Sequence, residues 1–352
     1  MKTDKTLVIL TPGFAADETD STCVPSLQVF VKAFKRLYPN TEVIILAFHY
    51  PYRKDNYSLF GAQIYSFNGK NRGKLFKLIT WRKVWNKLKE LHRLHPDMQL
   101  LSFWLDECGF VGENFSRRHH VNHKIWMLGQ DAKAGNRFYY RTKPSASSLI
   151  SVSETMSDRF FENYGIRPQY TVPIGIDISS FGVTEPNKER DIDVVGVGSL
   201  TTLKRYHLFV EAIKNLKQVK PDIKAVVCGK GPEHEHLQEL IDKYNLQENI
   251  TLAGEVPAGQ VFKVMQRSKV FLHPSSYEGF SSAVTEAFYA GCEVVSYTQP
   301  MHVMPSNFHR FNDEQELNKI MAKLFTGAQL VHQPVLLNSD EKIAQQIASI
   351  FW

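Results

Sequence analysis

The chain has 352 residues, 43% of them apolar, which is enough sequence for two ordinary domains with cores of their own. Its formal net charge of +6 is unevenly distributed: residues 1–175 contain 25 Lys and Arg against 15 Asp and Glu, and the remainder contains 17 against 21. Four scattered cysteines without a Cys-x-x-Cys pair argue against a disulfide framework and against a zinc site of that type. No apolar run approaches the ~20 residues of a transmembrane helix, and residues 1–5 do not resemble a signal peptide. We therefore expect a cytoplasmic protein whose basic first half faces an anionic partner or surface.

Strands and helices are predicted to alternate along the first half of the chain. Short apolar runs predict buried strands, and apolar residues at a 3.6-residue spacing predict helices. The predicted strands are 7–10, 42–48, 99–105, 124–128 and 148–152, and the predicted helices are 26–37, 75–94 and 154–164. Such alternation is typical of a parallel sheet with helices on both faces.

The same pattern restarts after residues 171–181, TVPIGIDISSF, which we interpret as an interdomain linker. In the second half we predict strands 193–197, 224–228, 250–252, 270–272 and 294–297, with helices 206–217, 235–244 and 260–267. The predicted fold is therefore α/β, with two Rossmann-like domains facing a cleft. Their predicted bounds are 1–172 and 173–338, followed by a C-terminal helix over 339–352. Ligands of such sheets bind outside the carboxyl ends of the strands.

Residues 273–297, HPSSYEGFSSAVTEAFYAGCEVVSY, form the most informative segment. The chain leaves a buried strand, passes through a polar loop to Glu278 and Gly279, and enters a helix that contains Glu286. A helix N-terminus presents unpaired N–H groups and a partial positive charge, which suits a phosphate. Gly279 lets the backbone approach a ligand closely. Two carboxylates beside a phosphate-binding end predict a site for a nucleotide that carries a polyhydroxylated group.

The Glu-x7-Glu spacing, with Ser-x-x-Glu-Gly-Phe before it and Glu-Ala-x-x-x-Gly-x-x-Val-Val after it, resembles a known signature. It is that of the family 4 retaining glycosyltransferases with the two-Rossmann GT-B architecture, the glycosyl transferases group 1. Further segments resemble the family in the same order: SVSETMSDRFFENYGI with TVPIGIDISSF, VGVGSLTTLKRYHLFVEAI, CGKGPEHEHLQELI and ITLAGEVP. The resemblance covers the second domain nearly end to end and the first domain only in part. It also implies that the C-terminal helix crosses back to the first domain.

The resemblance implies roles for individual residues of a donor site. Lys204 would neutralise the donor diphosphate, whose charge grows as the glycosidic bond breaks. Glu286 would hydrogen-bond the ribose hydroxyls, and Glu278 would contact the transferred sugar and contribute to catalysis without being assigned as a nucleophile. The other implied donor-binding residues are Gly13, Phe14, Ser199, Arg205, Gly229, Val256, Gly279, Phe280, Ser281 and Ser282. For Gly13 and Phe14, a plain strand-exit turn is an equally open interpretation, and Ser281 and Ser282 can also cap the helix.

Two positions depart from the family pattern. Ser199 stands where the family usually has an arginine, and whether Arg205 compensates for it stays open. Asp131 matches an aspartate that faces the sugar and is our third catalytic candidate, but the histidine that accompanies it in the family is absent. The histidines at 119, 120 and 123 we interpret as solvated. No metal site is predicted, because the Asp-x-Asp at 191–193 precedes a strand rather than following one.

Residues 70–93 form a basic segment with nine Lys and Arg, one Glu, and the aromatic residues Phe76, Trp81 and Trp85. A basic amphipathic helix with tryptophans suits an anionic bilayer and a lipid-linked acceptor. The alternative is a domain helix whose aromatic residues face the core and whose lysines face water. A nucleic-acid partner is not predicted, since no binding motif is present.

The sequence therefore predicts a retaining, metal-independent hexosyltransferase without a cofactor. It would move a sugar from a nucleotide diphosphate donor to a hydroxyl of a saccharide or lipid-linked acceptor, in polysaccharide or glycolipid biosynthesis, with possible peripheral contact at the inner membrane face. Two alternatives stay open: a nucleotide-sugar 2-epimerase, and a nucleotide-sugar-binding protein without turnover.

Overall fold

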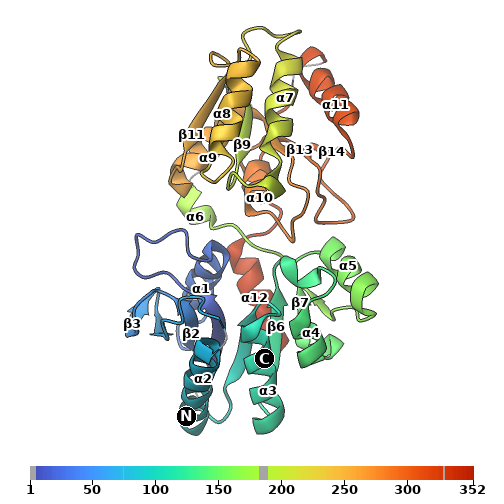
Figure 1. Cartoon of the computed structure of the whole chain (residues 1–352). Coiled ribbons are helices and arrows are strands. Elements are labelled where there is room, and N and C mark those ends of the chain that lie inside the picture. Colours follow the sequence, from blue (N-terminus) through green and yellow to red (C-terminus); the bar gives the residue numbers. More distant parts are fainter. Residues whose placement is uncertain (1–4, 74, 182–188, 328–329) are drawn as a thin grey trace. The chain divides into compact units, whose positions relative to one another are not determined.

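The structure, a computed structural model, describes residues 5–73, 75–181, 189–327 and 330–352 (Figure 1). The chain divides into two compact units, residues 1–177 with 338–352 and residues 178–337. Each unit is built around its own mainly parallel sheet. The predicted α/β class with two Rossmann-like folds is therefore confirmed.

The first unit contains an eight-stranded sheet in the order β3-β4-β2-β1-β5-β6-β7-β8. Its strands are β1 (Thr6–Gly13), β2 (Glu42–Tyr50), β3 (Asp55–Leu59), β4 (Ala62–Ser66), β5 (Gln99–Phe103), β6 (His123–Met127), β7 (Leu149–Ser151) and β8 (Tyr170–Thr171). All pairs are parallel except β3 with β4. This hairpin, which turns at Phe60 and Gly61 with both φ positive, was not predicted, because its polar and aromatic residues form no apolar run.

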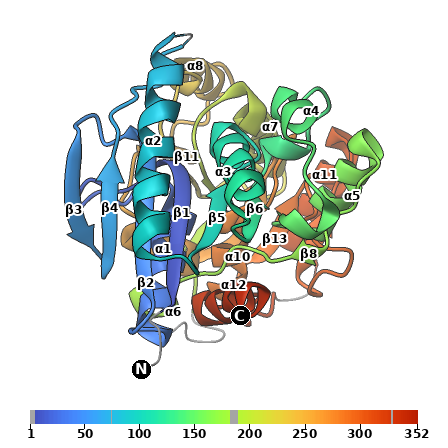
Figure 2. The same ribbon diagram turned by 90° about the horizontal axis from the view of Figure 1, so that it is seen from below.

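Helices cover both faces of this sheet. They are α1 (Pro25–Leu37), α2 (Leu75–Leu94), α3 (Glu107–His119), α4 (Arg137–Thr142), α5 (Glu154–Tyr164) and α12 (Asp340–Phe351), with 3₁₀ turns η1 (Gln130–Ala132) and η2 (Ala146–Ser148). Figure 2 shows α2 and α3 beside each other over one face, where they bury apolar side chains such as Leu88 and Phe115. Each such side chain contributes roughly 1.5–3 kcal/mol on burial. The predicted helices 75–94 and 154–164 are confirmed, whereas α3 and α4 were not predicted.

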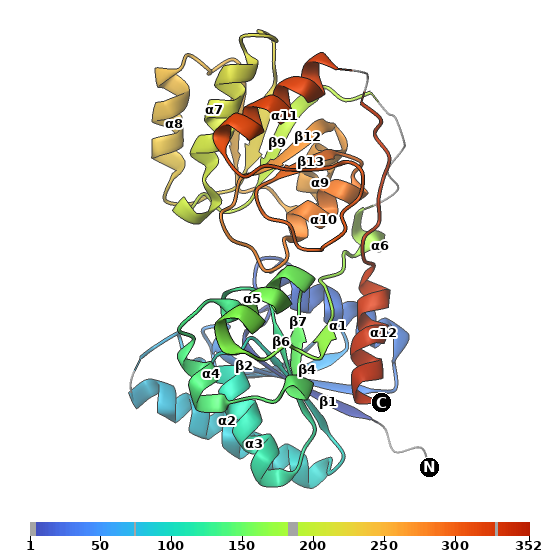
Figure 3. The same ribbon diagram turned by 90° about the vertical axis from the view of Figure 1, so that its right-hand side faces the viewer.

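The C-terminal helix α12 is part of the first unit and packs against α1 (Figure 3). Ser339 caps it by accepting the N–H of Lys342 at 3.2 Å, and Arg36 of α1 pairs with Asp340 at 2.9 Å. Ser339 also forms a parallel β-bridge with Ile176. The segments at 176 and 339 are therefore paired within one unit, although they are far apart in the sequence.

The second unit contains a six-stranded parallel sheet in the order β11-β10-β9-β12-β13-β14. Its strands are β9 (Ile192–Val197), β10 (Ala225–Cys228), β11 (Ile250–Gly254), β12 (Ser268–His273), β13 (Glu293–Ser296) and β14 (Phe308–Arg310). Its helices are α6 (Ile178–Phe181), α7 (Tyr206–Leu216), α8 (His234–Lys243), α9 (Ala258–Gln266), α10 (Ser282–Tyr289) and α11 (Glu314–Thr326). Helices α7, α8 and α11 cover one face, and α9 and α10 cover the other (Figure 3).

Candidate active site

The carboxyl ends of β9 and β12 form the centre of the site. Strands β10 and β11 lie on one side of β9 in the sheet, and β13 and β14 lie on the opposite side of β12. Adjacent strands at which the order reverses mark a topological switch point, where open α/β sheets bind ligands. Lys204 lies after β9 in a 3₁₀ turn (η3, Thr202–Lys204), and Glu278 lies after β12. The fold thus brings together two of the predicted residues at the place where a ligand is expected.

Glycines allow the loops at this edge to pack closely. The N–H of Gly198 donates to Cys228 O at 3.0 Å, and the N–H of Gly229 donates to Gly254 O at 2.7 Å. A Cβ added at Gly229 would lie 1.8 Å from the carbonyl oxygen of Gly198, so a larger residue does not fit there. Gly229 therefore holds the loops after β9 and β10 together, and a donor contact through its backbone stays a prediction.

Lys204, Glu278 and His273 form one cluster. Lys204 Nζ lies 2.5 Å from Glu278 Oε1, and His273 Nε2 lies 3.2 Å from the same oxygen. His273 is the last residue of β12 and its side chain is buried, whereas Lys204 and Glu278 are 18% and 19% exposed. His273 therefore forms the buried side of the cluster, and Lys204 and Glu278 form its partly exposed side.

The electrostatics of this cluster keep Glu278 ionised. Burial by itself raises the pKa of Glu278, but the hydrogen bond from His273 and the charge of Lys204 outweigh it and lower the pKa to about 2. Burial lowers the pKa of His273, which favours its neutral ring. Its Nε2–H then donates to Glu278, while Nδ1 is buried without a partner among the described residues. His273 was not predicted from the sequence, although a histidine that ends a buried strand five residues before a signature glutamate is a usable signal.

Glu286 on α10 has a different environment. Its half-buried carboxylate accepts no hydrogen bond from any residue that the structure describes, and burial raises its pKa to about 7. Carboxylates whose surroundings move their pKa values in opposite directions are typical of sites that divide roles between them. Glu286 thus offers free acceptor oxygens to the hydroxyl groups of a ligand.

The N-terminus of α10 contributes backbone N–H groups. Ser281 caps the helix, since its Oγ accepts the N–H of Val284 at 3.4 Å, and Ser282 is the first helical residue. The Phe280 side chain is buried, which leaves its backbone for ligand contact. A small pocket at this end is lined by Glu278, Gly279, Ser281, Val284, Thr298, Gln299 and Pro300.

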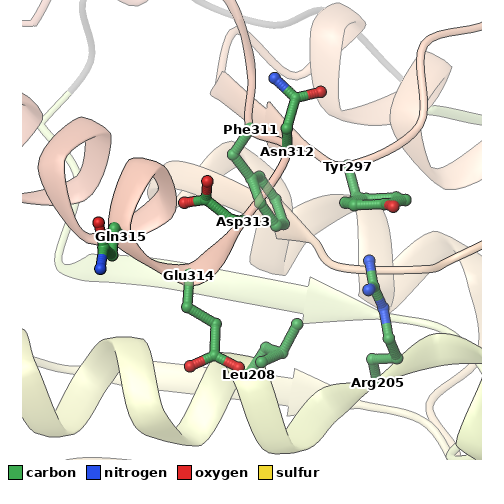
Figure 4. A pocket seen from close by; sticks show the side chains of 8 residues that line it. All are labelled: Arg205, Leu208, Tyr297, Phe311, Asn312, Asp313, Glu314 and Gln315. Carbon is green, nitrogen blue, oxygen red and sulfur yellow. The ribbon is translucent and has the colours of Figure 1, made fainter.

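Arg205 points away from this cluster, and its replacement of the missing arginine at Ser199 stays a prediction. Its Nε donates to Pro274 O at 2.8 Å, and its guanidinium lies 4.0 Å from the ring centre of Tyr297. The reason is the positive φ of Arg205, +50°, which turns its side chain away from that of Lys204. Figure 4 shows Arg205 and Tyr297 in a separate cavity of about 520 Å³, whose other lining residues are Leu208, Phe311, Asn312, Asp313, Glu314 and Gln315.

Two further predicted donor residues lie on loops of the same unit. Ser199 is exposed after β9, so a hydroxyl takes the place of a guanidinium there. Val256 is partly buried and packs against the apolar cluster under α9 and α10. Their donor contacts stay predictions.

The structure gives Asp131, in the first unit, a backbone-supporting position. One carboxylate oxygen accepts the N–H of Leu105 at 2.5 Å, and the other accepts those of Leu128 and Gly129 at 3.0 and 3.2 Å. The side chain is 4% exposed. Asp131 therefore holds the loops after β5 and β6 in place, and a direct role in catalysis stays a prediction.

Gly13 and Phe14 form a strand exit whose side chain is not available to a ligand. Phe14 is fully buried, with its ring edge-on to Phe60 at 6.3 Å. A Cβ added at Gly13 would lie 3.1 Å from both Cys23 Sγ and Tyr50 Cβ. The geometry favours the strand-exit turn for these two residues. Any contact with the donor would have to come from their backbone atoms.

His123 is buried, which corrects the expectation that the histidines at 119–123 are all solvated. Its Nε2 lies 2.8 Å from Ser102 Oγ, and its Nδ1 lies 3.0 Å from Glu113 Oε2. These are the contacts of a hydrolase triad, but all three side chains are buried, and Ser102 Oγ donates to Cys108 O. We therefore interpret this group as a satisfied core network.

The Asp191 and Asp193 side chains are already occupied by basic groups. Asp191 pairs with Arg267, and Asp193 accepts from Lys269 at 2.8 Å and from the N–H of Lys224 at 2.9 Å. Within the described ranges, no three His, Cys, Asp or Glu side chains converge on a point that suits a metal ion.

Helix α2 supports the domain-helix interpretation for its tryptophans. Trp81 and Trp85 pack against the core cluster under α2, which answers the open question for the aromatic face. Three apolar residues of the first turns nevertheless stay exposed: Phe76 at 56%, Leu78 at 56% and Ile79 at 50%. Lys74 of the basic segment lies outside the described residues. Among the helices described, none is long and apolar enough to cross a membrane.

Comparison with known proteins agrees with this geometry. The family model "Glycosyl transferases group 1" matches residues 182–304, which include Lys204, Glu278 and Glu286. Residues 182–304 of the chain therefore belong to the glycosyl transferases group 1 family. The family 4 resemblance of the sequence is therefore confirmed.

Relatives and solved structures extend the comparison. A phosphatidylinositol N-acetylglucosaminyltransferase component from Arabidopsis thaliana is 31% identical over 150 residues, 42% of this chain and 34% of that protein. The UDP-N-acetylglucosamine–peptide N-acetylglucosaminyltransferase GtfA subunit of Streptococcus agalactiae is 23% identical over 273 residues, 71% of this chain and 52% of that protein. The chain thus spans about a third to a half of the length of the curated relatives it matches.

The crystal structure of Anabaena Alr3699/HepE in complex with UDP and glucose has a similar fold. Its TM-score is 0.64 at 17% identity, and the match covers 98% of this chain and 95% of that chain. At this identity the likeness concerns the fold, which is that of two Rossmann-like units.

Proposed function

We propose that the chain is a retaining glycosyltransferase that moves a hexose-like sugar from a UDP-sugar to a hydroxyl acceptor. The observation that carries this proposal is the Lys204–Glu278–His273 cluster, which lies at the switch point of the second unit's sheet. Family membership supports it, because the matched segment contains the cluster's lysine and glutamate. The UDP bound in Alr3699/HepE supports the choice of base.

Lys204 would stabilise the leaving diphosphate. Its Nζ is a point charge paired with Glu278 Oε1 at 2.5 Å, so an incoming diphosphate would compete with that carboxylate for the lysine. Charge stabilisation in a water-poor site is commonly the largest single contribution to catalysis. The N–H groups at the start of α10 would share the phosphate charge with Lys204.

Glu278 would hold the transferred sugar and the positive charge that develops at its anomeric carbon. It is ionised, because its pKa lies at about 2, and it is fixed in direction by His273. We assign it no nucleophilic role. In this proposal the leaving phosphate guides the incoming hydroxyl on the same face of the sugar, which retains the anomeric configuration.

Glu286 would bind the ribose hydroxyls of the donor. Its carboxylate has no hydrogen-bond donor among the described residues, so two hydroxyl groups can satisfy it. A site built to pair with hydroxyl groups discriminates strongly against ligands that lack them, since its buried acceptors would stay unpaired.

The acceptor is proposed to bind the first unit, as a saccharide or a lipid-linked saccharide in polysaccharide or glycolipid biosynthesis. The exposed Phe76, Leu78 and Ile79 would support peripheral contact with the inner face of a membrane. The relative from Arabidopsis thaliana is named for transfer to phosphatidylinositol, and that from Streptococcus agalactiae for transfer to a peptide. Because these two relatives are named for different acceptors, the acceptor of this chain has to be identified by experiment.

The test is a thermal-shift panel of UDP, GDP, ADP and their sugar conjugates, on the wild type and Glu286→Ala. A ligand that binds only the folded state raises the melting temperature by mass action. We expect UDP compounds to stabilise the wild type and to lose this effect in Glu286→Ala. Glu239→Ala, at a side chain that is 81% exposed on α8, should keep the wild-type response. No response to any nucleotide would overturn the donor site.

Product analysis separates the rival activities. Incubation with the stabilising UDP-sugar and candidate acceptors should yield UDP and a new glycoside with retained anomeric configuration. Isomerised sugar on an intact nucleotide would instead identify a 2-epimerase. Tight donor binding with no turnover on any acceptor would identify a binding protein.

A further inference from the structure

A second cavity, of about 820 Å³, lies in the first unit at the carboxyl ends of β2, β5 and β6. Its walls come from the loop after β4, the start of α2, the start of α3, and α4. The lining residues are His49, Asn71, Arg72, Gly73, Lys77, Leu78, Trp81, Glu107, Arg137, Phe138 and Arg141. Its position at the strand ends is that of a ligand site in an open α/β sheet.

The floor of this cavity is a carboxylate with both oxygens engaged, Glu107. It accepts from His49 Nε2 at 2.8 Å, from Trp81 Nε1 at 2.5 Å, and pairs with Lys77 at 2.9 Å. Burial by itself raises the pKa of Glu107, but these three donors outweigh it and lower the pKa. Both oxygens of the carboxylate are engaged, and it holds Lys77 and Trp81 in fixed directions.

The rim of the cavity carries unpaired positive charge. Arg72, Arg137 and Arg141 are exposed, and none of them forms an ion pair with a described carboxylate. Arg72 lies 5.3 Å from the ring centre of Phe76, and Arg137 lies 5.1 Å from that of Phe138. Three unpaired guanidinium groups thus surround the Lys77–Glu107 ion pair. Guanidinium groups present paired N–H donors that match the oxygens of a phosphate.

The cavity also has an apolar side. Leu78 lines it and is 56% exposed, and Phe76 and Ile79 continue this exposed surface along the first turns of α2. Monomeric proteins rarely leave several large apolar side chains together in water without a binding role. Cations and apolar residues side by side suit a ligand with a charged head and an apolar chain.

The loop over His49 is conformationally strained. Asn68, Lys70 and Asn71 all have φ near +53°, as 53°, 53° and 52°, and the N–H of Asn71 donates to His49 Nδ1 at 3.3 Å. A Cβ at Gly69 would lie 2.5 Å from the same nitrogen. Strained backbone conformations cluster at ligand sites, where surrounding contacts hold them.

We propose that this cavity binds the phosphate or diphosphate group of an amphiphilic ligand, with Arg72, Arg137, Arg141 and Lys77 on the phosphate and Leu78, Phe76 and Ile79 on the apolar chain. Calling this ligand the acceptor rests on the glycosyltransferase function proposed above, whereas the binding itself does not. The same phosphate chemistry exists in free phosphorylated sugars, so the test has to separate the two sources.

The test is co-sedimentation of the full chain with phosphatidylcholine vesicles that contain phosphatidic acid, with pure phosphatidylcholine vesicles as the neutral reference. The pocket variant is Arg137→Glu with Arg141→Glu. The matched control is Arg82→Glu with Lys83→Glu, an equal charge change at exposed residues of α2 outside the cavity. We expect the pocket variant to lose at least about tenfold in vesicle partitioning and the control less than about threefold. Equal losses in both variants would overturn the cavity in favour of a diffuse basic surface.

A second arm uses soluble pyrophosphate and glycerol 3-phosphate in calorimetric titrations. Weak binding of these probes that the pocket variant loses, together with vesicle binding, supports the amphiphile. Binding of the soluble probes without vesicle binding overturns the amphiphile in favour of a free phosphorylated ligand. A triple variant, Phe76→Ser with Leu78→Ser and Ile79→Ser, should lose vesicle binding and keep the soluble probes, and unchanged vesicle binding would also overturn the apolar contact.

The UDP thermal shift on the same variants keeps the two proposals apart. A pocket variant that keeps its UDP response and the wild-type tryptophan fluorescence, which reports the first unit, is folded in both units, so its loss of vesicle binding is specific to the cavity. Vesicle binding without any UDP response would overturn the donor site and leave the cavity proposal intact. A UDP response without vesicle or phosphate binding would overturn the cavity proposal and leave the donor site intact.

Discussion

Two glutamates, the partly buried Glu278 and the buried Glu107, one in each unit, have similar partners. Glu278 of the second unit is held by Lys204 at 2.5 Å and His273 at 3.2 Å. Glu107 of the first unit is held by Lys77 at 2.9 Å and His49 at 2.8 Å. Both follow a strand at the carboxyl edge of their sheet, and both have a lowered pKa despite burial.

The difference between them lies in the second carboxylate oxygen. In Glu107, Oε1 takes Lys77 and His49, and Oε2 takes Trp81. In Glu278 both partners bind Oε1, and no described residue donates to Oε2. A carboxylate whose two oxygens are both engaged mainly positions its neighbours, whereas one with a free oxygen can bind a ligand as well. The same side-chain set therefore supports structure in one unit and suits chemistry in the other.

The largest expected effect is on catalysis by Glu278→Gln, which removes the charge and keeps the shape. We expect kcat for sugar transfer to fall by about 10²–10³, because charge stabilisation in the transition state is lost. UDP binding, measured by thermal shift, should persist. The control Glu239→Gln, at an exposed side chain, should leave kcat unchanged. A kcat within about threefold of wild type would remove Glu278 from the catalytic proposal.

Glu107→Gln should act on stability instead. Its loss leaves Lys77 without a counter-charge and weakens the contacts of His49 and Trp81, so we expect a cost of about 2–3 kcal/mol in the free energy of unfolding. Glu90→Gln, at a 58% exposed side chain paired with Lys87, should cost less than about 0.5 kcal/mol. Equal costs for the two variants would contradict this network of contacts.

Tryptophan fluorescence measures the free energy of unfolding of the first unit, in which Glu107 lies. All five tryptophans, at 81, 85, 104, 126 and 352, lie in the first unit. Urea denaturation followed at these residues therefore reports the unfolding of that unit alone.

Sequence patterns predicted single elements better than they predicted contacts between elements. The helices at 75–94 and 154–164 were predicted, because periodicity is a property of one element. Lys204 and Glu278 were found through a family signature, and their 2.5 Å contact follows from the order of β9 and β12, which no local pattern encodes. The direction of Arg205 depends on one positive φ, which its sequence context does not announce.

The basic cavity of the first unit illustrates the same limit. Its cations come from the loop after β4, from α2 and from α4, and α4 was not predicted at all. No sequence pattern connects Arg137 with Lys77, because they are placed together only by the packing of separate elements. The basic segment at 70–93 was recognised, but its tryptophans pack inward and the exposed apolar residues are Phe76, Leu78 and Ile79.

The pH dependence of stability distinguishes Glu286 from both held glutamates. Burial raises the pKa of Glu286 from 4.5 to about 7, so its contribution to stability is present below pH 4.5 and is lost as the pH rises through 7. For Glu278, whose pKa is lowered to about 2, the contribution is present above pH 4.5 and is lost as the pH falls toward 2. Glu286→Gln should thus be more stable than wild type by about 2 kcal/mol at pH 8 and nearly equal at pH 4.5.

Urea denaturation followed by circular dichroism between pH 4.5 and 8.5 checks this sign. Glu278→Gln serves as the opposite control, since it should be less stable than wild type at pH 8. A Glu286→Gln variant whose stability parallels that of wild type across this range would show that the carboxylate is solvated rather than buried.

The smallest expected effect concerns Arg205, and it tests which of two neighbouring cations belongs to the donor site. The Arg205 guanidinium stacks on Tyr297, and its Nε donates to Pro274 O, whereas Lys204 Nζ lies at Glu278. We therefore expect Arg205→Ala to change the UDP dissociation constant by less than about threefold, and Lys204→Ala to raise it at least about tenfold. Calorimetric titration measures both.

The two variants differ by one position in the chain, so a common effect on folding would change both constants together and would appear in their melting temperatures. A loss in Arg205→Ala as large as that in Lys204→Ala, at unchanged melting temperature, would mean that the guanidinium leaves Tyr297 when the diphosphate binds. Arg205 would then take the place of the arginine that the family usually has at the position of Ser199. A small effect leaves Lys204 and the N–H groups at the start of α10 as the groups that hold the diphosphate, which makes this site more dependent on a single lysine than the family pattern implies.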